Sequence, residues 1–67
     1  MRKYVPGDIA ILNLNGRDIS HFLVTSICDD LKIYTEAVYT LKELESGRDC
    51  MEPCAHFDGN HIFRRLE

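Results

Sequence analysis

The dipeptide Asn15-Gly16 constrains the fold more than any other feature of this sequence. It lies between two runs rich in β-branched and aliphatic residues, residues 9–14 and 21–27. Asn-Gly is a strong signal for a two-residue hairpin turn, because both residues tolerate positive φ angles. The sequence therefore predicts that the two runs pair as an antiparallel hairpin.

The first of these runs is apolar on both of its faces. Ile9 and Ile11 share one face of an extended chain, and Ala10 and Leu12 share the other. A strand of this kind is typical of a position buried on both sides. We therefore expect the later segments of the chain to close around the hairpin.

Three segments resemble parts of small SH3-like barrels, including KOW-type modules and many short phage-type proteins. The opening PGDIAI at residues 6–11 is similar to their first turn and strand. VYTL at residues 38–41 and IFRRL at residues 62–66 fit their middle and closing strands. The resemblance implies one all-β domain over residues 1–67, a five-stranded SH3-like barrel or rolled antiparallel sheet, with a turn or one helical turn near residues 58–60.

Residues 35–45 are the main ambiguity in this reading. As a helix they would place Val38, Leu41 and Leu44 on one stripe, giving an α+β fold with one helix near residues 35–45. The strand alternative is favoured by Val38-Tyr39-Thr40 and by the turn residues that follow at 45–48. Residues 49–57 would then return as a strand, and Pro53 would make it an edge strand or a bulged one.

Composition excludes several classes of function. The net charge is −3, from 11 acidic and 8 basic residues, which argues against a general binder of polyanions. No apolar run approaches the roughly 20 residues that span a membrane, and no signal peptide is visible. Three cysteines are an odd number and favour reduced thiols, so a cytoplasmic location is expected.

Cysteine and histidine residues suggest a candidate zinc site: Cys50, Cys54, His56 and His61. In an extended strand Cys50 and Cys54 would lie about 13 Å apart, too far to share one ion unless the strand bends at Pro53. Neighbouring acidic residues also disfavour a reactive thiolate at these cysteines. The sequence therefore predicts a protein that is not an enzyme and that needs no cofactor.

The predicted function is a non-enzymatic interaction module, a small accessory or regulatory factor that binds a protein partner. The resemblance to short phage-type proteins implies a host-directed role. Aromatic and arginine side chains are typical of binding hot spots, and an exposed edge strand can dock a partner chain. Alternatives are a nucleic-acid-binding module, with Arg2 and Lys3 added to the basic surface, a zinc-stabilised domain and a homo-oligomer. The predicted partner-binding residues are Tyr4, Tyr34, Phe63, Arg64 and Arg65.

Overall fold

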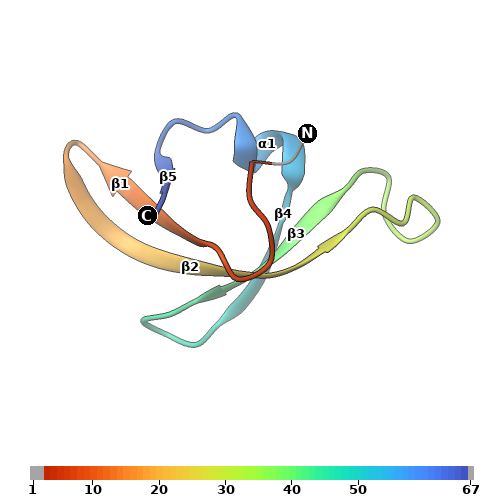
Figure 1. The fold of residues 1–67 in the computed structure, drawn as a ribbon, viewed down its shortest axis with the longest axis horizontal. Coiled ribbons are helices and arrows are strands. Elements are labelled where there is room, and N and C mark those ends of the chain that lie inside the picture. The colour runs from red at the N-terminus through yellow and green to blue at the C-terminus, as the bar shows by residue number, and fades with distance from the viewer. Residues whose placement is uncertain (1–2, 67) are drawn as a thin grey trace.

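A computed structural model describes residues 3–66 as an antiparallel five-stranded sheet with a short helix (Figure 1). The strand order across the sheet is β4-β3-β2-β1-β5. This arrangement confirms the all-β prediction at the level of a small antiparallel β-rich fold. Arg2, which the sequence adds to a basic surface, lies outside the described residues. The elements are β1 (Ile9–Leu14), β2 (Arg17–Cys28), β3 (Val38–Glu43), β4 (Asp49–Pro53), α1 (Cys54–Asp58) and β5 (Phe63–Arg65).

The Asn15-Gly16 turn connects β1 and β2, as the sequence predicts. Asn15 has a φ angle of 55° and Gly16 has a φ angle of 81°, so both turn residues are left-handed. This matches the right-handed twist of the two flanking strands. The pairing of Leu14 with Arg17 closes the hairpin directly beside the turn.

Replacing Gly16 with alanine should destabilise the fold by roughly 1 kcal/mol, because the new Cβ must adopt a left-handed backbone conformation. Apart from Gly16 and its two chain neighbours, no heavy atom lies within 4 Å of that Cβ position, so the cost is conformational and not steric. Asn15→Gly is the matched control and should be nearly neutral. Urea unfolding of the two variants measures this difference, and equal midpoints would contradict it.

Strand β2 belongs to both halves of the sheet. Its residues 17–23 pair with β1 and its residues 22–28 pair with β3, and the register with β3 shifts between Val24 and Ser26. At this irregularity the Thr25 hydroxyl donates to the Thr40 carbonyl at 3.0 Å. A bulge increases the local twist, and β2 follows a long curve from the β1 hairpin to the strand β3 (Figure 1).

Aromatic rings form the centre of the core. The centroid of the Phe57 ring, from α1, lies 5.2 Å from that of Tyr4, 5.5 Å from that of Tyr39 and 4.4 Å from that of Phe63. Helix α1 lies on the concave side of the sheet, next to the N-terminal segment (Figure 1). The core cluster of buried residues comprises Tyr4, Ala10, Val24, Tyr39, Leu41, Cys54 and Phe57.

Two expectations for the middle of the chain have different outcomes. The helix alternative for residues 35–45 is wrong, because Val38–Glu43 pairs with both β2 and β4. The returning strand predicted for residues 49–57 is wrong beyond Pro53, where α1 begins. Pro53 has no N–H to continue the ladder, whereas its φ angle of −56° suits the start of a helix.

Candidate protein-interaction surface

Strand β4 is an outer strand of the sheet and has one unpaired edge within residues 3–66. Toward β3, the Glu43 N–H donates to the Arg48 carbonyl and the Cys54 N–H donates to the Ala37 carbonyl, both at 2.9 Å. Backbone groups alternate in direction along an antiparallel strand. The N–H and carbonyl groups of Asp49 and Met51 must therefore face the unpaired edge.

A turn between β2 and β3 carries exposed apolar side chains, and Tyr34 of this turn contacts β4. The N–H groups of Ile33 and Tyr34 donate to the Asp30 carbonyl at 3.0 and 3.1 Å, which fixes the turn. The Tyr34 hydroxyl donates to the Met51 sulfur at 3.3 Å and so links the turn to β4. We call the set of Leu31, Ile33, Tyr34 and Met51 the apolar patch.

Most side chains of the apolar patch are largely exposed to solvent. Leu31 is 69% exposed, Ile33 is 65% exposed and Met51 is 53% exposed. Single exposed apolar residues are common, but grouped ones indicate an interaction surface. The sequence prediction included Tyr34 and missed the other three residues, although Leu31 and Ile33 already alternate with charged residues after Asp29-Asp30.

The edge strand itself is acidic. Asp49 is exposed, and Glu52 lies 3.7 Å from the Nδ1 atom of His56 on α1. Burial raises the pKa of the Cys50 thiol, and the negative charges of Glu52, Glu43 and Asp49 raise it further. The thiol therefore stays protonated at neutral pH, which is the opposite of what a cysteine nucleophile requires.

The candidate metal ligands do not converge. Cys50 lies on β4, Cys54 is buried in α1, His56 lies on α1 and His61 lies in the following turn. Within residues 3–66, no group of three histidine, cysteine or acidic side chains is placed to hold a metal ion. The bend at Pro53 thus does not assemble the zinc site that the residue types suggested.

Tyr4 is a correction to the predicted partner-binding set. It is 0% exposed and packs in the core against Tyr39 and Phe57, so a partner cannot reach it. Phe63 is half-buried, because its ring packs against Phe57 and Phe22. Of the three predicted aromatic anchors, only Tyr34 belongs to the apolar patch.

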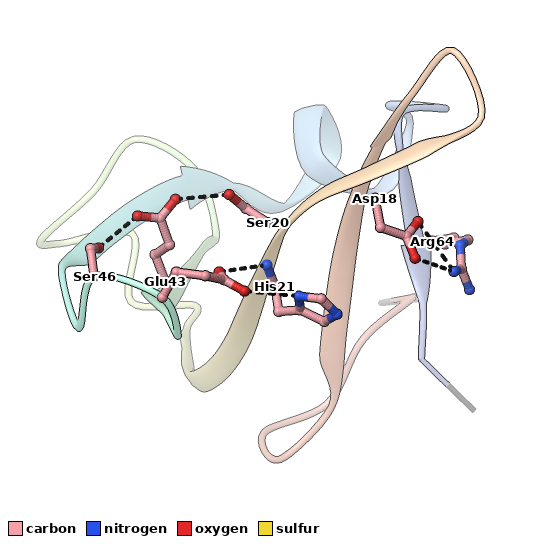
Figure 2. Close-up of polar contacts among 7 residues, drawn as sticks. Asp18, Ser20, His21, Glu43, Ser46 and Arg64 are labelled. Carbon is pink, nitrogen blue, oxygen red and sulfur yellow. Dashed lines mark hydrogen bonds and ion pairs between the residues drawn. The ribbon is translucent and has the colours of Figure 1, made fainter.

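Arg64 and Arg65 lie at the opposite edge of the sheet, and acidic side chains hold both. Arg64 Nη2 is 3.1 Å from Asp18 Oδ2 (Figure 2), and Arg65 Nε is 3.5 Å from Asp8 Oδ2. The pKa of Asp18 is lowered by the hydrogen bond from Asn13 and then by Arg64. These arginines are therefore neutralised locally and lie across the sheet from the apolar patch.

A second polar surface was not predicted from the sequence. His21 Nδ1 is 2.9 Å from Glu45 Oε2, and Glu43 accepts hydrogen bonds from Ser20 and Ser46 (Figure 2). Ile11 is 1% exposed and pairs with His21 on one side and Arg64 on the other. His21 and Arg64 therefore flank Ile11 on one face of the sheet, whereas Ser20 and Glu43 lie on the other face, beside Leu12 and Phe22.

Comparisons with protein-family models, with curated proteins and with solved structures found no match to this chain. Its geometry is consequently the basis for any functional assignment. Residues 3–66 form no pocket for a small molecule. None of the helical structure described here is long and apolar enough to cross a bilayer.

Proposed function

We propose that this protein is a non-enzymatic interaction module, a small accessory or regulatory factor that binds another protein through β4 and the apolar patch. The observation that carries the proposal is the contact between Tyr34 and Met51, which joins an exposed apolar turn to an unpaired strand edge. Backbone groups at such an edge supply affinity, and neighbouring apolar side chains supply specificity.

We also propose that the bent sheet is an SH3-like barrel. Three features support this assignment: the strand order β4-β3-β2-β1-β5, the long β2 shared by both halves, and the short α1 directly before β5. The fold alone assigns no partner, because one fold can carry many functions. The exposed residues of the surface therefore determine which partner this fold can bind.

Two observations favour a protein partner over a nucleic acid. A nucleic-acid surface needs unpaired cations with stacking aromatics, whereas Arg64 and Arg65 contact Asp18 and Asp8. The Tyr4 ring that would stack a base is buried beneath the Arg65 guanidinium, whose carbon lies 5.6 Å from the ring centroid. The net charge of −3 acts in the same direction.

Replacing Leu31 and Ile33 with serine together should abolish capture of the partner while leaving the fold intact, because both side chains are already largely exposed. The measurement is affinity capture from nuclease-treated cell extract with immobilised protein, read by quantitative mass spectrometry. Ile19→Ser is the matched control, since Ile19 is 50% exposed on β2.

We expect a protein that the parent chain and the Ile19 variant retain and that the double variant loses by about tenfold or more. Equal capture by all three chains would contradict the proposed surface. Material captured only from a parallel extract without nuclease treatment would instead identify a nucleic acid as the partner.

A further inference from the structure

We propose that the segment bound at β4 is an extended strand of another protein that adds antiparallel to this edge and carries the pattern basic–apolar–any–basic. This inference rests on the proposed function and specifies the chemistry of the partner. Three features of β4 support it: the outward backbone groups, the alternation of the side chains and the acidic charges.

The backbone groups define a short docking edge. Asp49 and Met51 each present an N–H and a carbonyl, and Pro53 presents only a carbonyl because proline has no N–H. In an antiparallel strand, one residue placed opposite Met51 exchanges both hydrogen bonds with it, and the residue two positions away does the same with Asp49. The edge therefore accommodates a segment of about five residues.

The side chains of β4 alternate between the two faces of the sheet. Asp49, Met51 and Pro53 share a face, whereas Cys50 and Glu52 share the face of Tyr39 and Leu41. Cross-strand neighbours on one face contact each other most closely. A residue opposite Met51 thus extends the apolar patch, and the residues opposite Glu52 and Asp49 each meet a carboxylate.

The carboxylates of β4 favour a partner strand that carries positive charge. The two charged residues of β4, Asp49 and Glu52, are both acidic. Like charges placed directly opposite each other destabilise a strand pair. An incoming strand with lysine or arginine at both positions satisfies the carboxylates, whereas an acidic strand is repelled.

Chain direction fixes the order of the pattern. An antiparallel segment passes Glu52 first, then Met51, Cys50 and Asp49, which gives basic–apolar–any–basic. A parallel segment would require the reverse, basic–any–apolar–basic. The two orders can be distinguished with synthetic peptides, since composition is identical and only direction differs.

The test titrates capped peptides centred on Lys-Leu-Thr-Lys, its reverse Lys-Thr-Leu-Lys and the acidic Glu-Leu-Thr-Glu against the whole chain, with backbone amide shifts of β4 as the readout. We expect Lys-Leu-Thr-Lys to bind at least about tenfold more tightly than either of the others, which corresponds to about 1.4 kcal/mol. The double variant Asp49→Lys, Glu52→Lys should invert the preference toward the acidic peptide.

Two further changes test strand addition itself. N-methylation of the peptide leucine removes the N–H that would donate to the Met51 carbonyl, and should weaken binding by about tenfold. Met51→Pro removes the donor from the protein side, and Met51→Ala is its matched control with the N–H kept. The methylated peptide remains informative if the proline variant does not fold.

Three results would overturn the inference: a preference for the acidic or reversed peptide, insensitivity to N-methylation, or a dimer that Met51→Pro dissociates and that excludes the peptide. If a peptide of another charge pattern binds at Met51, the partner chemistry is wrong but the proposed surface stands. If capture survives Leu31→Ser with Ile33→Ser, the surface itself is wrong.

Discussion

Replacing Phe57 with alanine should leave most of the protein unfolded at 25 °C. Phe57 is 2% exposed, and its ring contacts those of Tyr4, Tyr39 and Phe63. Truncating a buried phenylalanine costs about 3–5 kcal/mol, which includes the cavity left behind. A core this small rarely supplies more than about 3–5 kcal/mol in total, so the single substitution removes most of the margin.

The near-ultraviolet circular dichroism of the tyrosines measures this loss, together with urea unfolding. Two control variants bracket the result. Phe57→Leu keeps an apolar side chain and should fold with a lower midpoint, while Leu31→Ala should change stability by no more than about 0.5 kcal/mol because Leu31 is exposed. A folded Phe57→Ala protein with near-native stability would show that α1 is dispensable for the core.

Tyr39→Phe should destabilise the fold by about 1–3 kcal/mol although only one hydroxyl is removed. The Tyr39 hydroxyl donates to Asp58 Oδ1 at 2.6 Å and accepts from the backbone N–H of Tyr4 at 3.2 Å. Its removal leaves that buried N–H unsatisfied, and an unsatisfied buried donor costs about 1–3 kcal/mol. The single hydroxyl thus joins the N-terminal segment, β3 and the end of α1.

Tyr4→Phe is the matched control for Tyr39→Phe. The Tyr4 hydroxyl is buried and has no hydrogen-bond partner in the described part of the chain. Removing it should therefore be neutral or stabilising by up to about 1 kcal/mol. Equal losses in the two variants would contradict the hydrogen-bond argument and would assign both effects to packing.

Alkaline pH provides a second readout of the same hydroxyl. Burial, followed by the hydrogen bond to Asp58, raises the pKa of Tyr39 to about 12 in the folded protein, above its ordinary value of 10.0. This contribution to stability is fully present below pH 10 and is lost as the pH rises through about 12. Tyr39→Phe should lose less stability than the parent chain between pH 10 and about 12. The loss that remains in this variant comes in part from Tyr4, because burial raises the pKa of Tyr4 as well.

Local signals in the sequence predicted the elements whose backbone they determine directly. Asn15-Gly16 predicted the β1–β2 hairpin, because two left-handed residues leave the flanking strands few other paths. Val38-Tyr39-Thr40 favoured a strand over the helix alternative, because β-branched and aromatic residues are enriched in strands. Antiparallel pairing of β1 with β2 and of β3 with β4 then follows from their short connections.

Tertiary contacts decided what the sequence could not show. Tyr4 is outside any strand, and its burial depends on Tyr39 and Phe57, which lie far away along the chain. The helical turn after Pro53 likewise places Phe57 in the core. The prediction of a strand up to residue 57 was therefore wrong because of contacts between residues that are distant in sequence. The apolar patch was only partly predicted, because the Tyr34–Met51 contact joins two separate elements.

The sharing of β2 between both halves of the sheet has a consequence for how the molecule unfolds. The pair β1–β5 and the pair β3–β4 lie on opposite sides of β2. Both pairs depend on this one twelve-residue strand for their place in the sheet. Detaching that segment from either side exposes the aromatic interior to water. Loosening at one end of the molecule is therefore transmitted to the other end, and the docking edge persists only as long as the distant hairpin does.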